Sequence, residues 1–308
     1  MIVVVAPQAP PHARPDPRDD ALNAALDTFM AVRPRLFGIA YRMLGSASEA
    51  EDIVQEAWVR WQRYDRDTVE NPAAFLATTT TRLALNSVTS ARARRESYIG
   101  PWMPEPVDTS ADPALGAERG EALEFAILML MERLTPMERA AYVLRQAFDY
   151  PYETIASILE QTQANVRQLV SRARKHLAEQ RRDRVDADEQ RRLLAAFLAA
   201  AQAGEMAALE DLFAADVVST TDGNGVKNAA RRLVVGRERV AKFIAAFAHH
   251  FWTGTDQEWV EANGEPAILV RRGDEPLVLV SVTAGEDGVE QIRWMMAPAK
   301  LERIARTD

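Results

Sequence analysis

The segment from Asp149 to Leu177 carries the side chains best suited to recognise another molecule. It predicts two short helices joined by a polar turn, with Val166, Leu169 and Val170 on the buried side of the second helix. The other side offers amide, hydroxyl and cationic groups, namely Gln163, Asn165, Arg167, Gln168, Ser171, Arg172 and Lys175. In the DNA major groove, Arg pairs with guanine and Asn or Gln with adenine, through two hydrogen bonds each. The pattern favours a helix-turn-helix that reads DNA, and a plain hairpin with a solvated basic face is the alternative.

The net charge of −8 argues against nucleic-acid binding only as an average over the 308 residues. A second basic cluster stands at Arg82, Arg92, Arg94 and Arg95. Acids dominate elsewhere, notably between positions 49 and 56. Local basic patches determine phosphate binding, whereas global charge mainly affects solubility and association kinetics. The distribution predicts two DNA-facing surfaces and a remainder that contacts protein.

Residues 21–98 are expected to be all helical. After a break at Gly45-Ser46, Ser48 is a plausible N-cap for a helix whose first turn is acidic. The buried stripe of that helix is Ile53, Val54, Ala57, Trp58 and Trp61, and the two tryptophans are candidates for half-exposed anchors. Asn71-Pro72 opens a further helix, because Pro is tolerated in the first helical turn.

Two boundaries follow. Residues 99–117 contain four prolines and predict an extended linker, and helices resume over 118–184. Thr135-Pro136-x-Glu138 is a strong helix start, with a Thr N-cap and a Glu that completes a capping box. Residues 1–20 are expected to be a disordered tail.

From residue 188 to 308 the character changes to α+β. Two helices interrupted at Gly204 precede short strands at 266–270, 277–282 and 289–296, which are separated by turn sequences. We expect a separate domain with a mostly antiparallel sheet.

Composition excludes several classes. The chain has no cysteine, which rules out disulfides, thiolate zinc sites and cysteine nucleophiles. No apolar run approaches the ~20 residues of a membrane span, and the first residues lack the pattern of a secretory signal. A cytoplasmic location, with no membrane contact, is the simplest expectation.

The helical part resembles bacterial sigma factors of the extracytoplasmic-function class, in the sigma-70 family. Residues 34–61 are similar to the core-polymerase-binding segment, 71–96 to the promoter-melting segment and 134–177 to the fourth region, which reads the upstream promoter element. The resemblance implies a sigma factor that directs core RNA polymerase, through its β′ and β subunits, to promoter DNA. Such a protein has no chemistry and no cofactor of its own.

The resemblance also assigns roles to residues. Polymerase binding falls to Asp52, Gln55, Glu56, Trp58 and Arg60. Promoter melting falls to Thr79, Arg82, Asn86, Arg92, Arg94 and Arg95, whose groups suit a single strand.

The rest of the chain resembles a subgroup of these factors with a C-terminal SnoaL-like domain, an α+β cone that modulates the sigma factor. Trp102-Met103-Pro104-Glu105-Pro106 is similar to the WLPEP linker of that subgroup. Asp222, Gly223, Gly225 and Lys227 stand near its Asp-Gly-Gly-Gly-Lys motif, with Asn224 in place of the middle Gly. Lys300 and Leu301 match the end of its Asn-Pro-Asp-Lys-Leu motif, where Ala297 and Ala299 replace the Asn and Asp. These residues are the regulatory candidates.

Three alternatives stay open. SnoaL-like domains include enzymes, and the candidate acid–base residues here are Asp222, His249, His250, Asp256 and Glu258. The domain could instead sense a small-molecule ligand, or the chain could be a DNA-binding regulator that never joins polymerase. A calcium loop at Asp222 is excluded, since Val226 and Lys227 occupy positions that need a ligand and a glycine; no metal site is expected.

Overall fold

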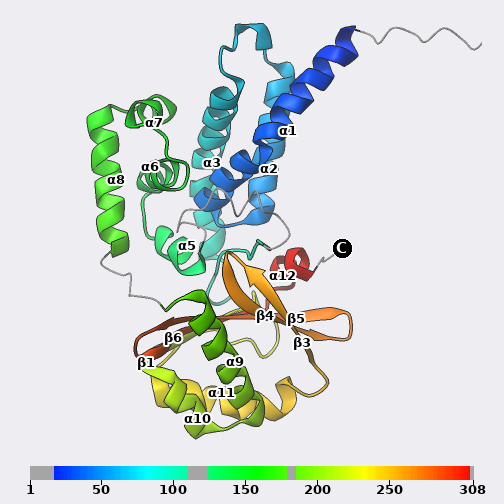
Figure 1. Cartoon of the computed structure of the whole chain (residues 1–308), viewed down its shortest axis with the longest axis vertical. Coiled ribbons are helices and arrows are strands. Elements are labelled where there is room, and N and C mark those ends of the chain that lie inside the picture. The colour runs from blue at the N-terminus through cyan, green and yellow to red at the C-terminus, as the bar shows by residue number, and fades with distance from the viewer. Residues whose placement is uncertain (1–16, 110–123, 179–184, 306–308) are drawn as a thin grey trace, which may run out of the picture.

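The structure, a computed structural model, describes residues 17–109, 124–178 and 185–305. A helical part lies above a six-stranded sheet, and three helices cover the far face of that sheet (Figure 1). The first helices are α1 (Pro17–Leu44), α2 (Ala47–Arg63) and α3 (Pro72–Glu96), with a short 3-10 turn η1 (Arg66–Thr68). Residues 17–20 of the expected tail are therefore helical, and the remainder of that tail lies outside the described residues.

Local signals locate the helix starts. Asn71 caps α3, and its side chain accepts a hydrogen bond from the backbone N of Ala74. The prediction of Ser48 as the cap of α2 was wrong, because Ser46 Oγ accepts from the backbone N of Glu49. Ser48 lies inside α2, where its own N–H and Oγ donate to Glu105.

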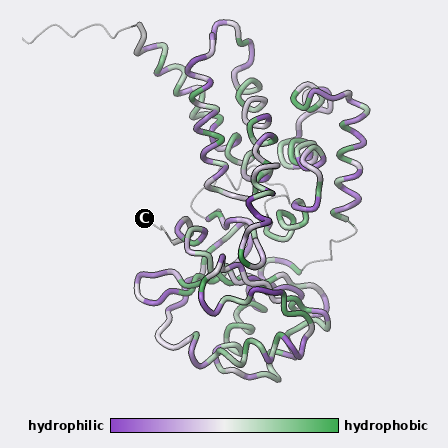
Figure 2. The backbone as a smooth tube through the Cα atoms, turned by 180° about the vertical axis from the view of Figure 1, so that it is seen from behind, coloured by the Kyte–Doolittle hydropathy of each residue, from purple (hydrophilic) through white to green (hydrophobic). Residues whose placement is uncertain are grey.

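The second group of helices is α5 (Phe125–Met131), α6 (Pro136–Gln146), α7 (Tyr152–Leu159) and α8 (Gln163–Ala178). The capping box of Thr135 and Glu138 is present at the start of α6. The predicted pair of short helices is present as α7 and α8, joined at Glu160 in a left-handed conformation (φ 54°). Hydrophobic and hydrophilic stretches alternate along α8, as expected of a helix with one buried face (Figure 2).

The two helical groups pack as one body. A single hydrophobic core holds Leu36 and Phe37 of α1, Leu76 of α3, Leu144 of α6 and Val166 of α8. Helix α6 packs against both α1 and α3. The two halves that the sequence separates at 99–117 are therefore in direct contact.

The last part contains α9 (Ala187–Ala203), α10 (Met206–Leu212), α11 (Arg237–Phe251) and α12 (Pro298–Ala305). Its strands are β1 (Phe213–Asp222), β2 (Val234–Val235), β3 (Asp256–Ala262), β4 (Glu265–Arg272), β5 (Glu275–Gly285) and β6 (Gly288–Met295). They lie in the order β2-β1-β6-β5-β4-β3, and only the β1–β6 pair of this sheet is parallel. The expected α+β architecture with a mostly antiparallel sheet is confirmed.

Both faces of this sheet are buried, and they belong to different cores. Ile268, Val280 and Trp294 face the core under α9 and α11. The alternate positions Leu269 and Leu279 face a second core, which includes residues from the helical part. Because side chains alternate along a strand, β4, β5 and β6 each contribute to both cores. Within the described residues, no helix is long and apolar enough to cross a membrane.

Candidate functional site

Helix α8 presents the predicted reading surface to solvent. Val166, Leu169, Val170, Ala173 and Leu177 are buried against the helical core. Of the predicted contact residues, Gln163, Arg167, Gln168, Ser171, Arg172 and Lys175 are exposed, and Asn165 is half-buried. Arg172 Nε lies 3.2 Å from Glu138 Oε1, and the guanidinium of Arg167 lies 5.3 Å from the ring centroid of Tyr152. This face combines long cationic and amide side chains with a rigid, buried back.

The arginines predicted to melt DNA are engaged inside the molecule. Arg82 donates to the backbone oxygens of Ser157 and Ile158, at 3.2 and 3.0 Å, and lies 3.0 Å from Glu160. Arg92 donates to the backbone oxygens of Glu132 and Leu134. Two of the predicted DNA-binding arginines of α3 therefore contact the backbone of the segment that contains α5–α7. Thr79 is half-buried and Asn86 is exposed on the same helix.

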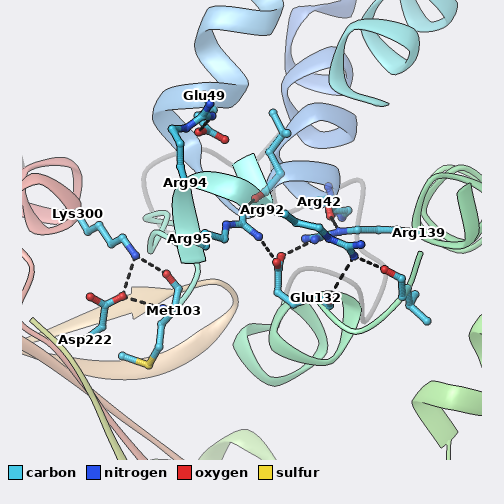
Figure 3. Close-up of polar contacts among 12 residues, drawn as sticks. Arg42, Glu49, Arg92, Arg94, Arg95, Met103, Glu132, Arg139, Asp222 and Lys300 are labelled. Carbon is cyan, nitrogen blue, oxygen red and sulfur yellow. Dashed lines mark hydrogen bonds and ion pairs between the residues drawn. The ribbon is translucent and has the colours of Figure 1, made fainter. Parts of the chain in front are cut away.

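Glu132 is the polar centre of this contact. Its carboxylate forms ion pairs with Arg95 of α3 and with Arg139 of α6 (Figure 3). The Nε of Arg139 also donates to the backbone oxygen of Arg42, at 2.8 Å. Burial lowers the pKa of Arg95 and of Arg139, since a buried guanidinium loses hydration. Arg94 pairs instead with Glu49, at the start of α2.

A groove between α1 and α2 coincides with the predicted polymerase-binding face. It is a hollow of about 330 Å³ whose lining includes Leu26, Met30, Gln55 and Trp58. Trp58 is half-buried, with its ring centroid 5.0 Å from that of Phe29. Leu22, Leu26 and Met30 are 44, 41 and 53% exposed. An exposed apolar strip next to polar side chains is typical of a protein contact.

Two details refine that face. Asp52, Gln55, Glu56 and Arg60 are all exposed, and Arg60 pairs with Glu56 at 2.8 Å. The expectation that Trp61 could be a half-exposed anchor was wrong, because it is 2% exposed and its Nε1 donates to the backbone oxygen of Ala25. Trp61 belongs to the core, and Trp58 alone of the two is accessible.

Residues 97–109, which we name the strap, run between the helical part and the sheet. Their central contact is a cluster of four residues, Tyr98, Met103, Asp222 and Lys300, which we name the latch. Figure 3 shows Met103, Asp222 and Lys300 of this cluster. Asp222 accepts hydrogen bonds from the Tyr98 hydroxyl at 2.6 Å, the Met103 backbone N at 2.7 Å and Lys300 Nζ at 2.7 Å. Lys300 Nζ also donates to the backbone oxygen of Met103, at 2.6 Å.

The latch is enclosed. Asp222 is fully buried and Lys300 is 7% exposed. The Lys300 ammonium lies 4.9 Å from the ring centroid of Tyr98 and 4.6 Å from that of Trp102. Burial lowers the pKa of Lys300, and Asp222 opposes that shift. Burial and the bond to Asp222 raise the pKa of Tyr98. Segments of the chain more than a hundred residues apart are thus tied by charge-assisted hydrogen bonds.

The other half of the strap ties α1 to the β3–β4 hairpin. The Tyr41 hydroxyl donates to the backbone oxygen of Glu105 at 2.7 Å and accepts from Asn263 Nδ2 at 2.6 Å. The Asn263 side chain also accepts from the backbone N of Val107, at 3.1 Å. Glu105 itself accepts from Ser46 and Ser48, which anchors the strap to the start of α2.

The predicted regulatory residues divide between the latch and its surroundings. Trp102, Glu105, Asp222 and Lys300 meet there, together with buried Pro104 and Leu301. A Cβ at Gly223 would lie 2.3 Å from the Cβ of Ala229, so only glycine fits. Gly225, at φ 85°, lies under the side chain of Ile99 of the strap. Lys227 does not join them, since it is exposed and lines a separate cavity.

A third core lies between the helical part and the sheet. It joins Met103 of the strap and Phe125 of α5 to Leu269, Leu279 and Met295 of the sheet. The guanidinium of Arg293 lies 5.8 Å from the Phe125 ring centroid and pairs with Glu265. This core places the sheet in contact with α5 and the strap.

The candidate acid–base residues are scattered. The Asp222 carboxylate belongs to the latch, and Glu258 forms an ion pair with Arg271. His249 and Asp256 line a shallow hollow of about 540 Å³, whereas His250 lines the cavity that also contains Lys227. Within the described ranges, no three His, Asp or Glu side chains are grouped so as to hold a metal ion.

Sequence reasoning missed Tyr41, Tyr98, Glu132 and Asn263. The Asn263-Gly264 pair is a hairpin signal, and both residues have positive φ, 58° and 75°. That signal locates the turn, but it does not reveal that the Asn side chain reaches α1. The contacts of Tyr41 and Glu132 join distant segments and leave no local trace in the sequence.

The helical part of this chain has the two regions that define sigma-70 transcription factors. Residues 28–94 match Sigma-70 region 2, and residues 124–177 match Sigma-70, region 4. Region 2 thus covers most of α1–α3, and region 4 covers α5–α8. Proteins of this family bind core RNA polymerase and promoter DNA.

Comparison with whole proteins narrows the class. The chain is 36% identical over 273 residues to the ECF RNA polymerase sigma factor SigJ of Mycobacterium tuberculosis, which spans 87% of this chain and 83% of the relative. It is 31% identical over 292 residues to the probable ECF RNA polymerase sigma factor SigI of the same organism, spanning 92% and 96%. The crystal structure of SigJ superimposes with a TM-score of 0.72 at 31% identity, covering 90% of this chain and 98% of that chain. The protein belongs to the ECF RNA polymerase sigma factors and acts in promoter-directed transcription initiation.

Proposed function

We propose that this sigma factor is held in a closed form by its own C-terminal domain and opens when it acts at a promoter. The observation that carries the proposal is the third core, in which α5, the strap and the sheet pack together. The sheet is bound to region 4 through Phe125 and to region 2 through Tyr41, and the latch binds it to the strap. A body bound to both regions restrains their separation.

The closed form has a direct consequence for DNA. Arg82 and Arg92, the proposed melting residues, donate to backbone oxygens of region 4. The N–H groups that make these bonds are not available to a single strand while α3 stays in contact with α5–α7. Promoter melting by α3 therefore requires that α3 and α5–α7 move apart.

The docking surface for polymerase is already accessible in the closed form. We assign it to the groove of α1 and α2, with Trp58 as the apolar anchor and Gln55 in its polar lining, and to exposed Glu56 next to Gln55 on α2. The partner surface is the coiled coil of the β′ subunit, and region 4 contacts the β subunit. Helix α8 reads promoter DNA. Because the proposed partners, RNA polymerase and promoter DNA, are in the cytoplasm, we expect the protein there too.

The test is Asn263→Gly, which removes the bonds to Tyr41 and to the strap but keeps the positive φ of the turn. Run-off transcription with purified core RNA polymerase, on promoter fragments of the source organism, should give more transcript from this variant than from the unaltered chain. Affinity for the same fragments should rise in parallel. Asn228→Gly is the matched control, since Asn228 also has positive φ (69°) and is exposed. Equal yield and equal affinity for Asn263→Gly and the unaltered protein would reject the closed-form proposal.

A further inference from the structure

The C-terminal domain contains a cavity of about 980 Å³ that borders the latch and is lined by no residue of the two DNA-facing helices. It lies between the open end of the sheet, α11 and the first turn of α12. The volume is at the upper end of the range for sites that take drug-sized molecules, about 300–1,000 Å³. The cavity is large enough for a specific small-molecule ligand.

Aromatic rings make the inner wall. Phe243, Phe247 and Phe251 come from one face of α11, and Trp294 lies opposite on β6. The ring centroids of Phe247 and Phe251 lie 5.8 and 6.1 Å from that of Trp294, edge to face. Trp294 Nε1 donates to Ser219 Oγ at 3.0 Å, so the polar edge of the indole is already satisfied. The wall therefore offers ring surface to an apolar occupant.

The charged residues at the rim of the cavity indicate which net charge the ligand has. Lys227 and Arg272 are matched by Glu275 and Glu302, and all four side chains are exposed. Equal numbers of opposite charges give no preference for an anion or a cation. We infer that the cavity binds an uncharged, mainly apolar ring compound.

The cavity and the latch share their walls. Thr221 lines the cavity, and its neighbour Asp222 faces the latch, because side chains alternate along β1. Pro298 and Glu302 of α12 line the cavity, and Lys300 between them points to the latch (Figure 3). The backbone oxygen of Asp222 accepts from the N of Met296, another lining residue, at 2.7 Å. The latch thus holds the cavity walls in the arrangement that encloses the ligand.

The shared walls predict whether the ligand inhibits or activates the sigma factor. This prediction rests on the proposed closed form. A compound that fits the cavity as it stands favours the latched state, because Thr221 precedes Asp222 in its wall and Pro298 and Glu302 flank Lys300. By reciprocity, weakening the latch lowers the affinity for the compound by the same factor. The bound ligand therefore acts to keep the sigma factor closed.

Binding is tested with a matched pair of fluorescent probes on the full chain. N-phenyl-1-naphthylamine is uncharged, and 1-anilinonaphthalene-8-sulfonate carries the same rings with a negative charge. Saturable fluorescence enhancement is expected for the uncharged probe, with an affinity about tenfold higher than for the sulfonate. No saturable binding overturns the site, and tighter binding of the sulfonate overturns the ligand class.

Location is tested by filling the cavity. Ala246→Trp puts an indole into it from an exposed position on α11 and should weaken the uncharged probe about tenfold. Lys242→Trp is the matched control, because Lys242 is exposed on the same helix but does not line the cavity. Equal loss in both variants, or in neither, overturns the assignment.

Coupling is tested with Tyr98→Phe, which removes one hydrogen bond from Asp222 without a buried charge being left unpaired. The uncharged probe should bind about fivefold more weakly to this variant. Unchanged affinity rejects the coupling to the latch. These measurements need no polymerase, so failure of the closed-form proposal in transcription is distinguished from failure of the binding site.

Discussion

Lys300 Nζ and Asp222 Oδ2 lie 2.7 Å apart in an ion pair that is almost completely buried. Burial of either charge alone is costly, and here the cost is offset by the hydroxyl of Tyr98 and by the backbone of Met103. Three segments distant in sequence must be in position at once to satisfy both groups. The pair therefore fixes how the strap lies on the C-terminal domain, beyond any net contribution to stability.

The first prediction concerns this pair. Lys300→Met should lower the free energy of unfolding by about 3 kcal/mol, because it leaves the Asp222 carboxylate buried without its cation. Denaturant unfolding followed by circular dichroism measures the loss. Arg192→Met, which removes the cation of an exposed pair with Glu189, should cause no measurable change. Similar stability of the two variants would show that the latch pair is dispensable.

The second prediction concerns polymerase. The combined change Glu56→Lys and Trp58→Ala should abolish binding to core RNA polymerase, because it reverses a charge and removes the apolar anchor beside the α1–α2 groove. Fluorescence anisotropy of labelled protein against purified core enzyme measures the affinity. Glu238→Lys, an equal charge reversal at an exposed position of α11, serves as the control. Retained affinity in the double variant would refute the docking surface.

The sequence predicted the parts of the structure that local signals determine. The capping box at Thr135 and the cap at Asn71 are present, and the α7–α8 pair lies where its periodicity indicated. These features depend on residues within a few positions of one another. Strands β4, β5 and β6 were anticipated in the same way, since turn residues separate them. The family resemblance also predicted the order of the sigma-factor regions along the chain.

The remaining features depend on distant contacts. Ser46 rather than Ser48 caps α2, and Glu105 of the strap engages both serines. Asp222 and Lys300 were selected from motif resemblance, but their pairing with each other and with Tyr98 needed the fold. Strands β1 and β3 were not anticipated, although Asn263-Gly264 after β3 is a hairpin signal. β3 pairs with its neighbour β4, whereas β1 pairs in parallel with β6, about 70 residues further along the chain.

The third prediction concerns promoter reading. Arg167→Ala should weaken promoter binding by about 1–3 kcal/mol and relax the preference for its base pair, because an exposed arginine on a recognition helix reads guanine. Competition binding with promoter fragments that differ by single base pairs measures both effects. Lys242→Ala, an equally exposed cation on α11, should leave affinity and preference unchanged. Intact preference in the Arg167 variant would remove this residue from the reading surface.

The last prediction concerns pH. The pKa of Tyr98 is raised by burial and by its bond to Asp222, and Lys300 and Glu105 are the other charged groups nearby. Above pH ~10, the ordinary pKa of a tyrosine, the unfolded chain loses this proton and the folded chain keeps it. The folded state then binds more protons, so the contribution of Tyr98 to stability is full below pH ~10 and declines as pH rises further.

Tyr98→Phe removes that contribution and its pH dependence together. The difference in unfolding free energy between the unaltered protein and the variant should therefore be constant from pH 7 to ~9 and shrink above pH ~10. Tyr64→Phe is the control, because Tyr64 is 48% exposed and lies outside the latch. A difference for Tyr98→Phe that stays constant through pH ~11 would mean that its hydroxyl does not hold a proton for Asp222.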